Sequence, residues 1–190
     1  MPKKVAFLDR DGVINVDIGY LHRVEDLAYL PNALAGAARL VDLGYALVVT
    51  TNQSGIGRGF YDAAAFETLM HRIGADFARN GAPLLAVYHC PHLPEAGCSC
   101  RKPSPGMLLQ AAREQDIDLA ASVMIGDKMS DLEAARAAGV GRGILIGSQG
   151  IEQLGSNETA VPDLVAAADW MEARDGHQIG AMDALKQLRD

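Results

Sequence analysis

Cysteine is scarce in this sequence of 190 residues, where it occurs three times and only within the segment CPHLPEAGCSC at residues 90–100. Long apolar runs are missing, and none approaches the roughly 20 residues that a membrane-spanning helix requires. Basic residues are outnumbered, with 17 Lys and Arg against 24 Asp and Glu and a net charge of −7. These shortages argue against a disulfide-rich secreted scaffold, a helical membrane protein and a nucleic-acid-binding surface, which needs a basic face.

The composition is that of a globular protein, with 49% hydrophobic and 22% charged residues. Residues 1–190 suffice for a single domain with a hydrophobic core, and no linker or repeat divides them. The segment MPKKVAFLDRDG has only a four-residue apolar stretch before charge returns, which is too short for a signal peptide. We therefore expect a cytoplasmic protein with no membrane or nucleic-acid partner, and a monomer because no apolar surface helix is evident.

Short apolar runs alternate with amphipathic stretches along the chain. The apolar runs predict strands at residues 5–8, 46–50, 84–89, 122–126 and 143–146. Apolar residues spaced three and four apart predict helices near 33–43, 62–79, 105–115 and 129–138. Strands alternating with helices indicate an α/β fold, a three-layer, doubly wound and mostly parallel sheet with helices on both faces.

Helix ends carry their own signals. Asn32, Asp62 and Ser130 are placed to cap three of the helices. Gly44 and Gly139 are placed to end two of them. After residue 150 the pattern is weaker, and it allows a strand over ADWMEA, residues 168–173, followed by a short final helix.

Polar clusters follow four of the predicted strands. In chain order they are Asp9 to Gly12, Thr51 to Gly55, Arg101 with Lys102 beyond the cysteine segment, and Asp127 with Lys128. A single Asp-X-Asp after a strand is most simply a polar turn, but four such clusters are poorly explained by coincidence. Ligands of open α/β sheets bind beyond the carboxyl ends of the strands, so we expect these side chains to converge at one edge.

The residue types in these clusters suit phosphoryl transfer. Asp9 and Asp11 leave their strand on the same side, so both can face one reacting atom. A carboxylate that attacks a phosphate meets like-charge repulsion, which Mg²⁺ and a lysine can neutralise. Asp127 is placed to be a second metal ligand, and Lys102 and Thr51 can hold the transferred phosphoryl group.

Four segments, DRDGVIN, VVTTNQSG, RKPSPG and MIGDKMSD, resemble in order the motifs of the haloacid dehalogenase (HAD) superfamily, whose phosphatases form an aspartyl-phosphate. The resemblance implies that Asp9 is the nucleophile and that Asp11 is the general acid and then the general base. It also implies that Asp9, the main-chain carbonyl of Asp11 and Asp127 hold Mg²⁺. Many relatives carry two neighbouring acids in the fourth motif, whereas here Lys128 follows Asp127. We therefore expect Lys128 to contact substrate phosphate and do not expect Asp131 to bind the metal directly.

The cysteine segment has the spacing of a metal site. Its four candidate ligands are Cys90, His92, Cys98 and Cys100. A Cys₃His set is a saturated tetrahedral zinc site with no position for a catalytic water, so its role is structural. His89 is the rival imidazole, but as the direct neighbour of Cys90 in an extended run it should point away. A disulfide would leave one thiol over and His92 without a purpose, whereas zinc would fix the loop that presents Arg101 and Lys102.

Three segments, INVDIGYLHRVED, TNQSGIGRG and CPHLPEAGCSCRKPSPGM, resemble the D-glycero-D-manno-heptose 1,7-bisphosphate 7-phosphatase family of lipopolysaccharide-core precursor synthesis. The histidinol-phosphate phosphatases share the zinc loop and the first Asp-X-Asp, and they are the nearest alternative. Asp17, Gly19 and Tyr20, the run NQSGIGRG and the GDK of the fourth motif favour the heptose family. The resemblance implies that substrate is held by Asp17, Ile18, Gly19, Tyr20, Thr51, Asn52, Gln53, Ser54, Arg101, Lys102 and Lys128.

The spacing of the motifs leaves no room for a large cap domain. Selectivity is then expected from a flap at about residues 13–31, the turn at 53–60 and the zinc loop at 90–100, which together would admit a compact sugar bisphosphate. A zinc-stabilised binding module without catalysis is a third possibility. It would be expected to lack at least one of four residues, and all four are present: Asp9, Asp11, Lys102 and Asp127.

Overall fold

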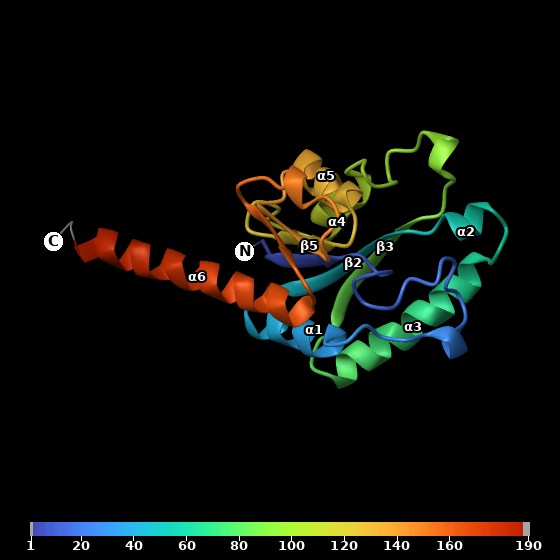
Figure 1. The fold of residues 1–190 in the computed structure, drawn as a ribbon, viewed down its shortest axis with the longest axis horizontal. Helices are drawn as coiled ribbons and strands as arrows, with labels where there is room; N and C mark the ends of the chain where they lie inside the picture. Colours follow the sequence, from blue (N-terminus) through green and yellow to red (C-terminus); the bar gives the residue numbers. More distant parts are fainter. Residues whose placement is uncertain (1, 188–190) are drawn as a thin grey trace.

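The computed structural model has six parallel strands in one sheet, in the order β3-β2-β1-β4-β5-β6 (Figure 1). The structure describes the backbone of residues 2–187 and the side chains of residues 2–175. The strands are β1 (Val5–Leu8), β2 (Ala46–Asn52), β3 (Leu84–Cys90), β4 (Val123–Gly126), β5 (Arg142–Ile146) and β6 (Glu158–Val161).

Helices cover both faces of this sheet. They are α1 (Ala33–Asp42), α2 (Ser54–Gly57), α3 (Ala63–Arg79), α4 (Gly106–Gln115), α5 (Met129–Ala138) and α6 (Leu164–Gln187). Three short 3₁₀ helices are η1 (Val24–Asp26), η2 (Pro94–Ala96) and η3 (Ile151–Gln153). Helices α1, α3 and α6 pack on one face and α4 and α5 on the other, which confirms the predicted three-layer α/β fold (Figure 1). No helix in the described part of the chain is long and apolar enough to span a membrane.

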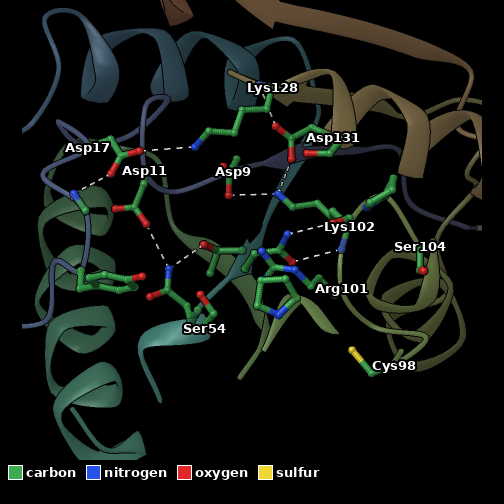
Figure 2. Close-up of a pocket in the computed structure, with 18 of the residues that line it drawn as sticks. Asp9, Asp11, Asp17, Ser54, Cys98, Arg101, Lys102, Ser104, Lys128 and Asp131 are labelled. Atoms are coloured by element: carbon green, nitrogen blue, oxygen red, sulfur yellow. Dashed lines mark hydrogen bonds and ion pairs between the residues drawn. The ribbon is translucent and has the colours of Figure 1, made fainter. Parts of the chain in front are cut away.

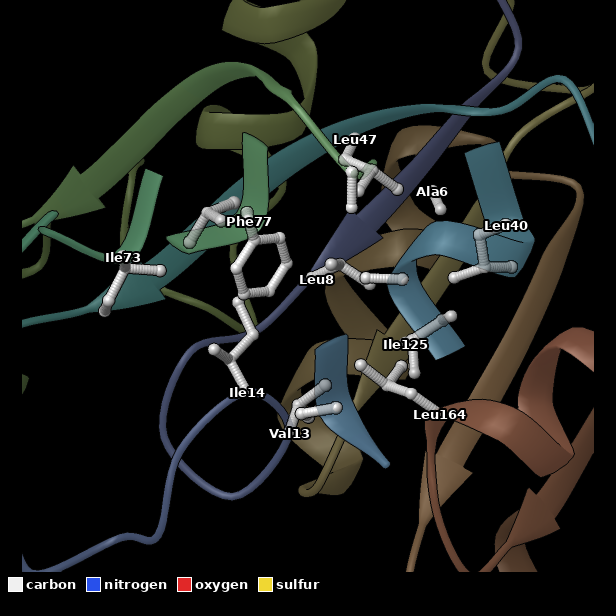
Figure 3. Packing of buried hydrophobic residues seen from close by; sticks show 14 of the residues in the cluster. Ala6, Leu8, Val13, Ile14, Leu40, Leu47, Ile73, Phe77, Ile125 and Leu164 are labelled. Atoms are coloured by element: carbon white, nitrogen blue, oxygen red, sulfur yellow. The ribbon is translucent and has the colours of Figure 1, made fainter. Parts of the chain in front are cut away.

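Strand β1 shows how the sheet is buried on both sides. Ala6 and Leu8 belong to the cluster packed against α1, α3 and α6, where Figure 3 shows them with Phe77 and Leu164. Val5 and Phe7 belong to the cluster packed against α4 and α5. Because successive side chains of a strand point to opposite faces, a strand covered on both faces is apolar throughout, as VAFL is.

The five predicted strands and four predicted helices are confirmed, with ends that shift by at most two residues. Asp62 caps α3 as predicted, since its Oδ1 accepts a hydrogen bond from the main-chain N–H of Ala65 at 2.8 Å. Gly139 ends α5 in the left-handed conformation, with φ of 82°. Gly44 follows the end of α1 with φ of 85°.

Two predicted caps are wrong. Asn32 precedes α1, but its side chain donates to Asp163 Oδ2 at 2.7 Å instead of capping the helix. Ser130 lies inside α5, which begins at Met129. The residue before that helix is Lys128, whose main-chain N–H donates to Asp131 Oδ2 at 3.1 Å.

The chain after residue 150 departs from the prediction. Strand β6 is an additional strand beside β5, and its half-buried residues ETAV lack the continuous apolar run that marked the other strands. The strand predicted over residues 168–173 is wrong, because that segment lies within α6. Buried residues recur there at helical spacing: Leu164, Ala167, Ala168 and Met171.

The flap, residues 13–31, is fastened to the body of the protein. Its two ends pair through main-chain bonds, with Leu30 N donating to Ile14 O at 3.0 Å. Tyr29 then donates its hydroxyl to Asp76 Oδ2 on α3 at 2.8 Å. Arg72 and Arg79 contact the same carboxylate, so Asp76 joins the flap to α3 through one buried acceptor.

Replacing Asp76 by Asn tests this attachment. Hydrogen bonds from Arg72, Tyr29 and Arg79 outweigh burial and lower the pKa of Asp76 to about 2, from an ordinary value of 3.8. Because the folded pKa is the lower one, the carboxylate stabilises the fold fully above about pH 4, and this contribution is lost as the pH falls towards about 2. Asp76→Asn should lower the thermal midpoint by about 3 °C or more at pH 7, and the difference should shrink below pH 4 in scanning fluorimetry.

Asp42→Asn, at an exposed carboxylate of α1, is the matched control, with a shift of less than about 1 °C at either pH. A midpoint difference for Asp76→Asn that stayed constant from pH 7 to pH 2 would contradict the linkage.

Candidate active site

The polar clusters meet where three neighbouring strands end. Asp9 follows β1, Thr51 and Asn52 end β2, and Asp127 follows β4. The strand order changes direction between β1 and β4, which is the place where open α/β sheets bind ligands. A pocket of about 800 Å³ opens at this edge (Figure 2).

Most of the predicted substrate and catalytic residues line this pocket. The lining residues are Asp9, Asp11, Asp17, Gly19, Tyr20, Thr51, Asn52, Gln53, Ser54, Tyr61, Pro94, Gly97, Cys98, Arg101, Lys102, Pro103, Ser104, Lys128, Ser130 and Asp131. Ile18 is predicted as a substrate contact but lies outside the lining, with 56% of its surface exposed. Asp127 also lies outside the lining and belongs instead to a cluster of carboxylates beside Asp9.

A buried ammonium group holds this acidic cluster together. Lys102 Nζ lies 3.0 Å from Asp9 Oδ1 and 2.6 Å from Asp131 Oδ1, and it donates to the main-chain carbonyl of Thr50 at 2.7 Å. Burial acts to lower the pKa of Lys102, but the charges of Asp9 and Asp131 more than compensate and raise it. Lys102 is therefore a cation fixed against Asp9, in a place where charge is weakly screened.

The same cluster could hold a divalent cation. Carboxylate oxygens of Asp9, Asp127 and Asp131 lie within 4.8 Å of one another. Burial and the nearby charge of Asp9 raise the pKa of Asp127 to about 7. Asp127 Oδ1 is buried and has no hydrogen-bond partner among the described residues. A hard cation such as Mg²⁺ prefers carboxylate oxygens, so Asp9 and Asp127 fit such an ion.

Asp131 is occupied differently from Asp127. Its Oδ1 contacts Lys102, and its Oδ2 accepts from the main-chain N–H of Lys128. Both oxygens are thus engaged within the protein. This geometry indicates that Asp131 orients Lys102 and is not a metal ligand.

Glycine is required directly after the second aspartate of the first motif. Gly12 has φ of 84°, a conformation that side chains with a Cβ rarely adopt. A Cβ at this position would lie 2.4 Å from Asp127 Oδ2. The close approach of the two loops, and hence the proximity of Asp9 to Asp127, depends on this glycine.

The side chain of Asp11 is held by donors from three residues. Arg10 Nη2 donates to both carboxylate oxygens, at 3.0 and 2.9 Å. Asn15 Nδ2 donates to Oδ1 at 2.9 Å, and Gln53 Nε2 donates to Oδ2 at 3.1 Å. Arg10 is fully buried. Its position in the sequence, between the two aspartates of DRD, was the signal that could have identified it as a site residue. Sequence reasoning missed Arg10 and Asn15.

Asn52 holds the main chain of Lys102. Its Oδ1 accepts from Lys102 N at 3.1 Å, and its Nδ2 donates to Lys102 O at 3.1 Å. The side-chain amide of Asn52 therefore fixes the segment after the zinc loop to the end of β2. This pairing does not test its predicted contact with substrate, but it gives Asn52 a defined structural task.

Lys128 spans the mouth of the pocket towards the flap. Its Nζ lies 3.4 Å from Asp17 Oδ2 and 3.4 Å from Asp127 Oδ2. Asp127 and Asp17 raise the pKa of Lys128 against the lowering effect of burial. Asp17 is in turn held by the main-chain N–H of Gly19 at 2.9 Å. Figure 2 shows Lys128 and Asp17 facing each other above Asp9 and Asp11.

The four predicted zinc ligands come together. Cys90 Sγ lies 3.6 Å from both His92 Nδ1 and Cys98 Sγ, and Cys100 Sγ lies 3.3 Å from His92 Nδ1 and 3.5 Å from Cys98 Sγ. A tetrahedral zinc with bonds of about 2.3 Å has sulfur–sulfur edges of about 3.8 Å, which these spacings approach. The three thiols are free, so the disulfide alternative is not supported. His89 points elsewhere and packs 4.3 Å from the ring of Phe66.

The zinc loop is joined to the other walls of the pocket. Gln53 N donates to Cys90 O at 2.7 Å, and Gly57 N donates to Pro91 O at 2.9 Å. At its far end, Gly106 N donates to Ser99 O at 3.0 Å where α4 begins. The loop therefore ties the turn after β2 to the segment that carries Lys102.

Comparison with known proteins gives consistent results. Residues 99–168 match the family described as HAD-hydrolase-like. The D-glycero-beta-D-manno-heptose-1,7-bisphosphate 7-phosphatase of Escherichia coli strain K12 is 42% identical over 172 residues, which cover 87% of this chain and 86% of that protein. The D-glycero-alpha-D-manno-heptose-1,7-bisphosphate 7-phosphatase of Photorhabdus laumondii is 43% identical over 150 residues, covering 75% and 82%.

A solved structure agrees with these relatives. The crystal structure of D,D-heptose 1,7-bisphosphate phosphatase from B. bronchiseptica, complexed with magnesium and phosphate, superposes with a TM-score of 0.82. The two chains are 35% identical, and the superposition covers 90% of this chain and 99% of that one.

Asp131→Asn tests whether Asp131 orients Lys102 or binds metal. Removing one of the two carboxylates from a fully buried ammonium should lower the free energy of unfolding by about 3 kcal/mol in urea titrations. The Mg²⁺ affinity measured by calorimetry should fall but not be lost, because the proposed ligands remain and only the negative charge beside them is reduced. Lost Mg²⁺ affinity with unchanged stability would instead identify Asp131 as a metal ligand.

Proposed function

This chain belongs to the D-glycero-D-manno-heptose-1,7-bisphosphate 7-phosphatase family of the HAD superfamily, and we propose that it removes the 7-phosphate of that sugar bisphosphate by way of an aspartyl-phosphate. The observation that carries the proposal is Asp9 at the carboxyl end of β1, 3.0 Å from the buried ammonium of Lys102 and beside Asp127. The enzyme is thus a phosphoric monoester hydrolase.

The first half-reaction transfers the phosphoryl group to Asp9. The Asp9 carboxylate attacks phosphorus, and Lys102 and Thr51 hold the phosphoryl oxygens at the edge of the sheet. Asp11 gives a proton to the departing sugar oxygen. Asp9, Asp127 and the main-chain carbonyl of Asp11 would hold Mg²⁺, which supplies positive charge at the phosphoryl oxygens when bound.

The second half-reaction releases phosphate. Asp11, now a carboxylate, takes a proton from a water that attacks the phosphorus on Asp9, and the Asp9 carboxylate departs. One side chain therefore serves as acid and then as base. Lys102 contacts Asp9 before the reaction and so offsets the charge of that carboxylate. While Asp9 is esterified, this N–H of Lys102 would pass to an oxygen of the phosphoryl group, and it would return to Asp9 when phosphate leaves.

Recognition of the rest of the substrate falls to short loops. A pocket of about 800 Å³ suits a sugar bisphosphate. Arg101 lines it with a buried Nη1 that has no hydrogen-bond partner among the described residues, which suits capture of an anion. Lys128 and Asp17 lie at the mouth, and Tyr20 packs edge-on against Phe60 at 4.7 Å to form an apolar rim. Ser54 and the main chain at Gly19 complete the polar lining.

Zinc is proposed as the structural metal of the loop at residues 90–100, held by its three thiolates and His92 Nδ1. The monomer expected from the sequence stays a prediction. We further propose that the reaction belongs to the cytoplasmic synthesis of ADP-heptose for the lipopolysaccharide core, as the sequence resemblance implies.

The substrate assignment is tested by phosphate release. With Mg²⁺ present, the protein should hydrolyse D-glycero-D-manno-heptose 1,7-bisphosphate, tested as both anomers, far faster than histidinol phosphate. Asp9→Asn should lower turnover by on the order of a thousandfold or more, because an amide is a poor nucleophile. Mass spectrometry of borohydride-trapped parent enzyme should locate the label at Asp9. Equal or zero turnover of the heptose and histidinol substrates would contradict the assignment.

Cys98→Ser tests the structural metal. The variant should carry less than one zinc per chain by plasma mass spectrometry, and its thermal midpoint should fall by more than about 5 °C. Activity should fall as well, because the loop leads directly to Arg101 and Lys102. Ser99→Ala, an exposed position in the same loop, should keep its zinc and midpoint. Full stability and activity in zinc-free protein would show that the loop does not need the metal.

A further inference from the structure

We propose that Gln53 and Tyr61 are positioning residues that set the direction of the Asp11 carboxylate. This inference rests on the proposed function, in which Asp11 transfers protons. It concerns a chain of hydrogen bonds that runs from the hydroxyl of Tyr61 through the amide of Gln53 to Asp11.

All the polar atoms of the Gln53 side chain are engaged within the protein. Its Nε2 donates to Asp11 Oδ2 at 3.1 Å and to Thr51 Oγ1 at 2.8 Å, which uses both amide hydrogens. Its Oε1 accepts from the hydroxyl of Tyr61 at 2.5 Å. Gln53 is only 3% exposed. A side chain so occupied is suited to orienting its neighbours and has no donor left for a substrate.

Tyr61 determines which end of the amide faces Asp11. A carboxylate only accepts hydrogen bonds, so the amide must present its NH₂ group to Asp11 and its oxygen to Tyr61. The Tyr61 hydroxyl supplies the donor that this orientation requires. Without the hydroxyl, the buried Oε1 would lose its partner, and a flipped amide would place its oxygen against the carboxylate of Asp11.

The ring of Tyr61 is itself fixed. It stacks on His22 of the flap with ring centroids 4.9 Å apart and an angle of 3° between the planes. The turn after β2 also fits closely around the ring, because a Cβ added at Gly55 would lie 2.2 Å from Tyr61 Cε1. The flap and the turn therefore set the place of the hydroxyl, and through Gln53 the place of Asp11.

Loss of the hydrogen bonds from Tyr61 through Gln53 to Asp11 should impair proton transfer more than substrate binding. Arg10 and Asn15 hold Asp11 from its own loop, and Gln53 contacts it from the turn after β2 and so links Asp11 to Thr51. A shift in the Asp11 carboxylate would impair protonation of a sugar oxygen, a poor leaving group. It would matter little for a phenolate, which leaves without a proton.

Tyr61→Phe tests this prediction. On the heptose bisphosphate, kcat should fall about tenfold or more while KM stays within about twofold, because the lost function is proton transfer. In single turnovers with enzyme in excess, release of p-nitrophenolate from p-nitrophenyl phosphate should stay within about twofold of the parent. The thermal midpoint is measured alongside.

Two further variants sharpen the result. Tyr88→Phe is the matched control, because Tyr88 is 8% exposed like Tyr61 and its hydroxyl donates to Glu114 at 2.8 Å. It should leave both reactions unchanged. In a Gln53→Ala background, Tyr61→Phe should cause no further loss, because there is no amide left to orient.

Equal losses on both substrates would reduce Tyr61 to a structural role, and unchanged kcat would show that its hydroxyl is dispensable; either overturns the inference. Inactivity of the parent on heptose bisphosphate would instead overturn the proposed function. The same comparison would then be made on histidinol phosphate or another alkyl phosphate that the parent hydrolyses. A parent that hydrolyses no alkyl phosphate would overturn both.

Discussion

The buried contact between Lys102 and the carboxylates of Asp9 and Asp131 is the interaction on which the site depends. Three acidic side chains gathered at one end of a sheet repel one another, and the ammonium groups of Lys102 and Lys128 leave a surplus of negative charge. Burial and the charge of Asp9 raise the pKa of Asp127 against the opposing charge of Lys128. The surplus makes the site receptive to a divalent cation, and a bound cation would in turn offset the repulsion between Asp9 and an incoming phosphate.

The position of Lys102 is secured from several directions. Asn52 pairs with its main chain, Thr50 accepts from its Nζ, and the zinc loop delivers the chain to it. A metal bound by the predicted zinc ligands would therefore support the architecture of the site without taking part in the chemistry. A cation in a poorly screened environment changes its energy steeply with distance, so a small displacement of Lys102 would be costly.

Much of the fold and of the site could be predicted because the residues that determine them are contiguous in the sequence. The strand VAFL followed by DRDG, or the ligands between Cys90 and Cys100, are local patterns with a direct physical meaning. The network around Asp11 was not accessible in this way, because Tyr61 and Gln53 meet it through the fold and carry no periodic signal. The prediction after residue 150 was wrong for a related reason. Strand β6 is half buried and lacks a continuous apolar run. In α6 the buried residues between 164 and 171 include the small Ala167 and Ala168, so their helical spacing is a weak pattern in the sequence.

The zinc loop has a consequence for how this family of sites can diversify. Its two ends carry the predicted zinc ligands, while Pro94 and Gly97 between them form part of the pocket wall. The ends of this wall are fixed, because Cys90 belongs to β3 and Pro91 O accepts a hydrogen bond from Gly57 N. The stretch between the two ligand pairs could therefore change in length or shape while its ends keep Lys102 in place. New substrate preferences could arise by exchanging a few residues at the rim while the reactive centre is inherited intact.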